Sequence, residues 1–233
     1  MPEEIIQAKN ISKSFGELQV LKEVNVAIRK AEVVAITGPS GAGKTTLLQL
    51  LGSLSSPDTS ENASLVIQGT DILQLNAKAL AAFRNQNLGF VFQFHELLDE
   101  FTALENVMMP GLIQGKKQSE LKEKAQKLLQ RLGVDHRLDH KPNSLSGGEQ
   151  QRVAVARALM NDPAIIFADE PSGNLDSQNA AALHELFFEL RDELQQTFVI
   201  VTHNKSLAAM ADRTIQLVDG KITPWKKQRL KPF

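Results

Sequence analysis

A glycine-rich segment that contains a lysine and a threonine is the clearest chemical feature of the chain. It matches the pattern G-x-x-x-x-G-K-[ST] with Gly38, Pro39, Ser40, Gly41, Ala42, Gly43, Lys44 and Thr45. Glycines let the backbone turn its N–H groups around phosphate oxygens, and the following helix adds the positive end of its dipole. In this pattern the lysine reaches the β- and γ-phosphates and the last hydroxyl binds Mg²⁺. We predict a phosphate-binding loop rather than an accidental turn, because a buried strand precedes it and a helix follows.

Two adjacent carboxylates, Asp169 and Glu170, come directly after the apolar run 165–168. In parallel sheets, ligands bind at the carboxyl ends of the strands, where these side chains would lie. We predict that Asp169 serves the Mg²⁺ shell and that Glu170 polarises the water that attacks the γ-phosphate. Many buried strands end in acidic residues, so this prediction depends on the phosphate-binding loop.

A second glycine pair opens a helix that we expect to end at Met160; the segment is Leu145, Ser146, Gly147 and Gly148. Glycines at a helix start expose N–H groups to an anion. The same segment also fits a helix that is simply well capped, because Ser146 can be the N-cap and Glu149 can complete a capping box. Local chemistry leaves both interpretations open.

The elements around these motifs alternate between strands and helices. Strands are predicted at 5–11, 21–28, 32–37, 64–68, 88–93, 164–168, 198–202, 215–218 and 221–223, with a hairpin at Asp219-Gly220. Helices are predicted at 44–51 and 180–194, and in a region from Thr102 to Met160 that begins with a capping box. The pattern indicates an α/β fold with a helical insertion.

The composition is that of an ordinary globular protein and excludes several classes of function. The 233 residues include 26 Lys and Arg against 27 Asp and Glu, a net charge of -1 that gives no general attraction to nucleic acid. The chain has no cysteine, which excludes disulfides, thiolate metal sites and cysteine nucleophiles. No apolar run reaches the roughly 18 residues of a membrane helix, and the N-terminus does not resemble a secretory signal.

Six motifs in order resemble the ATP-binding subunits of ABC transporters, over nearly the whole chain. The phosphate-binding loop resembles the Walker A motif, the Asp169-Glu170 pair the Walker B motif, and Leu145 to Gly148 the signature. Gln93 is similar to the Q-loop glutamine, Ser172 to Asp176 to the D-loop, and His203 to the switch histidine. Phe15 stands where the family places an aromatic ring that stacks on adenine.

The resemblance implies one P-loop NTPase domain of the ABC type over 1–233, with a mostly parallel central sheet and an N-terminal antiparallel β-subdomain. The core would span about 1–93 and 161–225, the helical subdomain about 94–160, and a basic tail 226–233. ATP would be held by Phe15, Gly38 to Thr45, Thr46 and, from a second copy, Ser146, Gly147 and Gly148. Mg²⁺ would be held by Thr45, Gln93 and Asp169, and the catalytic roles would fall to Lys44, Gln93, Glu170 and His203. ATP would close a homodimer that hydrolysis reopens.

A closer resemblance, to the ATPases of lipoprotein-releasing systems, is carried by 88–95, 97–98 and 101–110. It implies an ATPase at the cytoplasmic face of the bacterial inner membrane that powers lipoprotein release towards the outer membrane. The partners would be permease subunits, with no nucleic acid and no other membrane contact. ATPases of macrolide or peptide efflux and of cell division are the alternatives. The single cassette and the net charge argue against a nucleic-acid-associated ABC ATPase. The signature and His203 argue against a kinase of small metabolites.

The segment after Gln93 is where the family contacts its membrane partner. We expect the apolar surface for a permease helix to be formed by Phe94, Leu97, Leu98 and Phe101. The alternative is that these side chains form a satellite core.

Two positions depart from the family pattern, and four histidines receive no catalytic role. Glu149 stands where the broad family has Gln, and Ser172 where this branch usually has Thr. His136 and His140 have the i, i+4 spacing of metal ligands, but the polar stretch around them favours a solvated connection. We expect His184 at a surface or boundary position and His95 at the partner surface. Trp225 is expected to pack where the last strand ends, and the tail 226–231 to be solvated.

Overall fold

Two sheets organise residues 3–223, the part of the chain that the computed structural model describes. The expectations for Trp225 and for the tail 226–233 lie outside these residues. The first sheet is antiparallel with the order β2-β1-β4-β5, formed by β1 (Glu4–Phe15), β2 (Leu18–Arg29), β4 (Ser64–Ile67) and β5 (Thr70–Asp71). It confirms the expected antiparallel N-terminal sheet.

The second sheet has the order β10-β9-β3-β8-β7-β6. Its strands are β3 (Val33–Thr37), β6 (Leu88–Phe92), β7 (Ile165–Asp169), β8 (Thr197–Val201), β9 (Arg213–Val218) and β10 (Lys221–Thr223). The first five pair in parallel, and β10 pairs antiparallel to β9 across the expected Asp219-Gly220 hairpin. The predicted α/β class with a mostly parallel central sheet is therefore confirmed.

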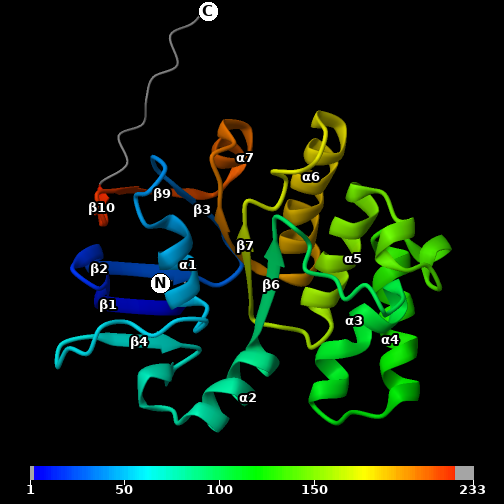
Figure 1. Ribbon diagram of the computed structural model, residues 1–233, viewed down its shortest axis with the longest axis horizontal. Helices are drawn as coiled ribbons and strands as arrows, with labels where there is room; N and C mark the ends of the chain where they lie inside the picture. The colour runs from blue at the N-terminus through cyan, green and yellow to red at the C-terminus, as the bar shows by residue number, and fades with distance from the viewer. Residues whose placement is uncertain (1–2, 224–233) are drawn as a thin grey trace, which may run out of the picture.

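Residues 3–223 contain seven α-helices and three short 3-10 helices. The α-helices are α1 (Lys44–Leu51), α2 (Ala77–Asn87), α3 (Ala103–Ile113), α4 (Gln118–Arg131), α5 (Gly147–Leu159), α6 (Ser177–Leu194) and α7 (Lys205–Met210). Figure 1 shows α3, α4 and α5 together on the side of the molecule away from the antiparallel sheet. None of these helices is long and apolar enough to cross a bilayer.

The central strands are buried on both faces, as their near-continuous apolar runs predict. Successive residues of β3 and β7 point to opposite faces. Val34 and Phe167 pack with α1 and the antiparallel sheet, whereas Val33 and Ile166 pack with the helices α3 to α6. The carboxyl ends of the parallel strands are thereby fixed between two hydrophobic cores.

Local signals fix where several helices begin. Thr102 and Ser146 start α3 and α5 with the predicted capping boxes, in which each side chain accepts an N–H three residues on. The sequence did not predict α2 and α7. None of the residues of α2 is fully buried, so it lacks the apolar periodicity that signals a helix, and α7 has only 6 residues.

Candidate functional site

The phosphate-binding loop connects β3 to α1, and its shape depends on glycine. A Cβ at Gly38 would lie 2.1 Å from the carbonyl oxygen of Leu217 on β9, so no other residue fits there. Gly43, with a φ of 97°, is the N-cap of α1 and provides no side-chain cap. The first N–H groups of α1 and its dipole are therefore available to an anion. Lys44 Nζ donates to the carbonyl oxygens of Gly38 and Pro39 at 3.1 and 3.0 Å, so the ammonium lies across this loop.

Thr45 and Asp169 meet at the carboxyl ends of the central strands. The Thr45 hydroxyl donates to Asp169 Oδ1 at 3.3 Å. Burial raises the pKa of Asp169 above its ordinary value, and this effect outweighs the opposing hydrogen bond from Thr45. Mg²⁺ prefers oxygen ligands and would supply the positive charge that a desolvated carboxylate lacks. The two side chains therefore fit the predicted Mg²⁺ shell.

Glu170 is held from two sides. It has a φ of 46°, and its N–H donates to the carbonyl oxygen of Val201 at the end of β8 at 2.9 Å. Its Oε2 lies 2.9 Å from Nδ1 of His203 and accepts the backbone N–H of the same residue at 3.2 Å. The side chain of His203 is 75% exposed and that of Glu170 only 18%. The carboxylate thus has a fixed position, while the imidazole can be reached by a ligand.

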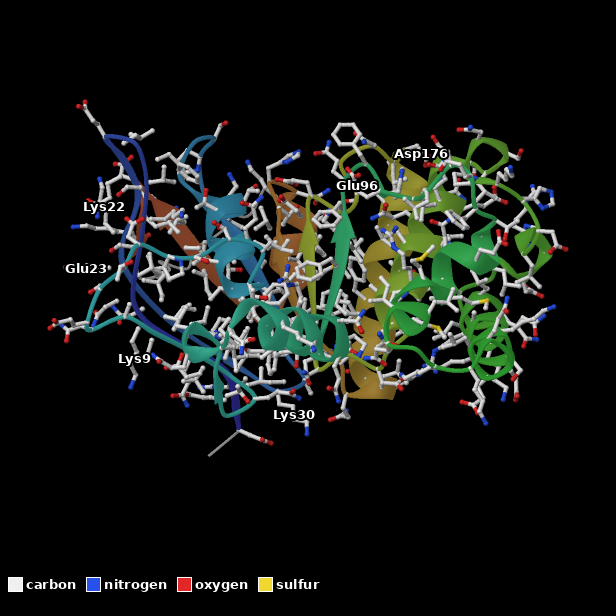
Figure 2. All side chains as sticks on the ribbon, turned by 60° about the horizontal axis from the view of Figure 1, so that its bottom comes forward. Lys9, Lys22, Glu23, Lys30, Glu96 and Asp176 are labelled. Carbon is white, nitrogen blue, oxygen red and sulfur yellow. The ribbon has the colours of Figure 1, made fainter. Side chains whose placement is uncertain are left out.

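Gln93 and the D-loop hold each other through a reciprocal pair of hydrogen bonds. Gln93 Nε2 donates to Asn174 Oδ1 at 3.0 Å, and Asn174 Nδ2 donates to the Gln93 carbonyl oxygen at 3.1 Å. A Cβ on Gly173 would lie 2.8 Å from Gln93 Nε2, so the glycine makes room for the glutamine. In Figure 2, Glu96, three residues after Gln93, and Asp176, at the end of the D-loop, both lie at the edge towards which β6 points.

The signature residues begin α5 and lie apart from the phosphate-binding loop. Ser146 and Gly147 are exposed, and Figure 1 shows β6 and β7 between α1 and α5. The carboxylate of Glu149 accepts the Ser146 N–H at 2.7 Å and pairs with Arg137 Nε at 2.8 Å. The Arg137 hydrogen bond, followed by that of Ser146, lowers the pKa of Glu149 to about 2. Glu149 is therefore a charged carboxylate whose neighbour Arg137 balances its charge.

Phe15 ends β1 at the rim of the antiparallel sheet. Its side chain is 55% exposed, and Lys13 Nζ lies 5.4 Å from the ring centroid. Phe15 is therefore not a core residue. An aromatic face is accessible there, as stacking on adenine requires.

The histidines without a predicted role have different surroundings in the structure. His184 was expected at a surface or boundary position, and this expectation is wrong: the residue is 3% exposed, and its Nε2 lies 2.9 Å from Ser172 Oγ. His136 instead lies 3.3 Å from Glu149, and no cluster of three potential metal ligands of the His, Cys, Asp or Glu type occurs in residues 3–223. His95 is half-buried, and Arg157 donates to its carbonyl oxygen at 2.7 Å.

The expected partner surface is only partly as predicted. Phe94, Leu98 and Phe101 are exposed, but Leu97 packs against the core, so the satellite-core alternative holds for that residue. A groove of about 520 Å³ lies next to this segment instead. Its lining includes Phe90, Phe92, Met109, Pro110, Ile113 and Arg157. These residues come from β6, α3 and α5, so no single stretch of sequence could have revealed the groove.

The sequence profile of the ABC transporter family matches residues 21–173. The chain belongs to this family and is an ATP-binding subunit whose ATP hydrolysis is coupled to transport. The fold agrees with that of a dimeric bacterial ABC transporter cassette. The TM-score is 0.86 and the identity 38%, over 97% of this chain and 100% of the other. A dimeric post-hydrolysis cassette bound to ADP and phosphate gives a TM-score of 0.85 at 37% identity, with the same coverage of 97% and 100%.

Within the family, the chain is similar to the lipoprotein-releasing system ATP-binding protein LolD. It is 58% identical to LolD of Bacteroides thetaiotaomicron, over 94% of this chain and 99% of that relative. LolD of Shewanella denitrificans is 48% identical over 94% of both chains.

Proposed function

We propose that the chain is the ATPase of a lipoprotein-releasing ABC transporter. The observation that supports this proposal is the 58% identity to LolD along nearly the full length of both chains. The ATPase would bind permease subunits at the cytoplasmic face of the bacterial inner membrane and drive the release of lipoproteins towards the outer membrane. The core at about 1–93 and 161–225 would carry the phosphate site, and the helical subdomain at about 94–160 the signature.

Binding of ATP would use the positive groups that face the loop between β3 and α1. The ammonium of Lys44 would exchange the neutral carbonyl oxygens of Gly38 and Pro39 for phosphate oxygens, a stronger interaction because the oxygens are charged. Phe15 would stack on adenine. Thr45, Gln93 and Asp169 would hold Mg²⁺, which when bound neutralises charge on the β- and γ-phosphates.

Hydrolysis would depend on Glu170 as the group that orients water and accepts its proton. His203 holds the carboxylate of Glu170 through Nδ1 and through its backbone N–H. This contact fixes the carboxylate at the end of β7 without blocking both of its oxygens. Lys44 would balance the charge that develops on the phosphate oxygens, because an ammonium near them stabilises that charge.

Two copies of the chain would form each complete site. Ser146, Gly147 and Gly148 lie on α5, apart from the loop of the same chain, and would contact the γ-phosphate bound by a second copy. ATP would then favour the closed dimer, and loss of the γ-phosphate would favour the open one. The dimeric cassettes to which the fold is similar support this arrangement.

The permease helix would dock in the groove beside the segment after Gln93. The groove is lined by apolar side chains, with Arg84, Arg157 and Glu96 among its polar groups. Ile113, 70% exposed, lies in its lining at the end of α3. An amphipathic helix with an apolar face and charged flanks fits such a groove. Arg157, a residue of α5, lines the groove and donates hydrogen bonds to the carbonyl oxygens of His95 and Glu96.

The test combines the chain with a permease of the lipoprotein-release type in proteoliposomes that contain a lipoprotein. We expect ATP-dependent transfer of the lipoprotein to a soluble acceptor. Ile113→Glu should abolish co-purification with the permease and leave the ATPase activity of the isolated chain intact. Leu194→Glu is the matched control, because Leu194 is also exposed but lies outside the groove. Transfer that needs an efflux permease or a cell-division partner instead would overturn the proposed cargo.

A further inference from the structure

The contact between His184 and Ser172 links helix α6 to the turn after β7, which carries Glu170 and Asn174. His184 lies within α6 and Ser172 in the turn after β7, and both side chains are at least nine-tenths buried. His184 Nε2 lies 2.9 Å from Ser172 Oγ, a distance typical of a good hydrogen bond. Burial lowers the pKa of His184, so the imidazole is neutral near pH 7. The pair is therefore a buried hydrogen bond between two neutral side chains.

Ser172 lies between the two groups that the ATPase site needs from this loop, the carboxylate of Glu170 and the amide of Asn174. The Gly173 N–H donates to the Glu170 carbonyl oxygen at 2.9 Å, and the Leu175 N–H donates to the Ser172 carbonyl oxygen at 3.2 Å. Residues 170–175 thus form a tight turn with local backbone hydrogen bonds, and the Glu170 N–H also bonds to Val201 at the end of β8. The Ser172 hydroxyl attaches this turn to α6.

The opposite side of the turn is pressed against Gln93. Gly173 leaves no space for a Cβ beside Gln93 Nε2, and Asn174 exchanges two hydrogen bonds with Gln93. A shift of the turn would therefore move Glu170, Asn174 and Gln93 together. α6 can resist such a shift, because it is capped by Asp176 and buries Leu183, Phe187 and Leu190 in the core.

We propose that His184 is a positioning residue for ATP hydrolysis: its hydrogen bond to Ser172 fixes the turn that places Glu170 at the end of β7 and Asn174 against Gln93. The proposal rests on the ATPase activity of the chain and not on its cargo. It predicts an effect on turnover rather than on ATP binding, because the groups that would hold the phosphates come from β3, the phosphate-binding loop and α1, and Thr45 and Asp169 would still hold Mg²⁺. Catalytic geometry is sensitive to displacements well below 1 Å, so a loosened turn is sufficient.

The experiment removes and then restores the hydrogen bond in the full-length chain. Ser172→Ala and His184→Leu remove it. Ser172→Thr keeps the hydroxyl, and His184→Gln keeps a polar atom close to the position of Nε2. Leu186→Ala is the control for loss of stability alone, since Leu186 is buried on the same helix and belongs to the hydrophobic core. The kcat at saturating ATP and Mg²⁺, the KM for ATP and the Tm are measured for each variant.

We expect kcat to fall about tenfold in Ser172→Ala and in His184→Leu, with an unchanged KM. The double variant should lose no more than either single variant, because both changes break the same bond. Ser172→Thr and His184→Gln should keep most of the kcat, and Leu186→Ala should lower the Tm without a matching loss of kcat. The proposal is overturned if both removal variants keep wild-type kcat, if the losses multiply in the double variant, or if Leu186→Ala loses kcat equally. None of these results would alter the lipoprotein-release assay of the wild-type chain.

Discussion

Two helix N-termini face the nucleotide in the proposed dimer, and they are built differently. α1 begins at Gly43 without a side-chain cap, so the N–H groups of its first turn remain free for phosphate. α5 begins at Ser146 with a complete capping box, in which the Glu149 carboxylate already accepts an N–H. An anionic side chain at the start of α5 would repel a phosphate, yet Arg137 lies 2.8 Å from it. The N-terminus of α1 is therefore open to an anion, whereas the N-terminus of α5 is capped and the charge of its capping carboxylate is balanced by Arg137.

This difference indicates that the N-termini of α1 and α5 have different roles in the proposed site. An open N-terminus with Lys44 beside it suits tight binding of ATP to a single chain. A capped N-terminus has less capacity for an anion and suits a contact that forms only when the second chain arrives. Substitutions at these two ends should therefore affect binding, dimer closure and hydrolysis separately.

The largest effect is expected for Glu170→Gln at the end that binds ATP. The variant should keep ATP affinity and lose about 10²–10⁴-fold in turnover, because a positioned base is removed while the groups around phosphate remain. It should elute from a sizing column as a dimer when ATP is present. Turnover within a few-fold of the wild type would contradict the role of Glu170.

A smaller effect is expected for Phe15→Ala. Stacking of a base on an aromatic ring contributes ~1–3 kcal/mol to binding. Stacking discriminates little between bases, so the affinities for ATP and GTP should fall together. The Tm without nucleotide should hardly change, because Phe15 is 55% exposed. Calorimetric titration with both nucleotides checks this, and an ATP affinity equal to that of the wild type would contradict stacking.

Sequence alone predicted those parts of the molecule whose chemistry lies in one continuous segment. The phosphate-binding loop, the two capping boxes and the hairpin at Asp219-Gly220 have residue types fixed at short spacings. The central strands were predicted because both of their faces are buried and their residues are therefore nearly all apolar.

Features built from several elements could not be predicted in this way. The burial of His184 depends on how α6 packs beside the turn after β7, and the sequence around it reads as an ordinary amphipathic helix. The groove combines residues of α2, β6, α3 and α5, which no single stretch of sequence brings together. Leu97 was predicted to belong to the partner surface because its packing against the core depends on the fold of the helical region. The pairing of Arg137 with Glu149 crosses 12 residues and requires the fold of the connection between them.

The end contributed by α5 can be tested with Gly147→Ala. A Cβ at this position would meet only Leu175 Cδ2, at 3.7 Å, which is an ordinary contact. Alanine also favours a helix over glycine, so the isolated chain should be at least as stable as the wild type. The new methyl group would occupy space at the proposed dimer contact, and we expect about a tenfold loss of ATP-driven dimer and of turnover, with unchanged ATP binding by the monomer. Equal dimer formation by sedimentation would contradict the contact of Gly147 with the γ-phosphate.

The smallest effect is expected for Arg137→Ala, which removes the charge that balances Glu149. In the folded chain the pKa of Glu149 is about 2, below its ordinary value of 4.5, chiefly because of the Arg137 hydrogen bond. A lowered carboxylate pKa stabilises the fold above about pH 4.5, and this contribution is lost as the pH falls towards 2. Arg137→Ala should therefore reduce the free energy of unfolding by about 1–2 kcal/mol at pH 7, and the difference from the wild type should shrink between pH 4.5 and pH 3.

Urea unfolding at several pH values measures this difference. Arg131→Ala is the control, because Arg131 has the same side-chain exposure of 35% but pairs with the more exposed Glu193. An equal loss in both variants, or a difference that does not depend on pH, would show that Glu149 needs no balancing charge and would remove the contrast between the two helix ends.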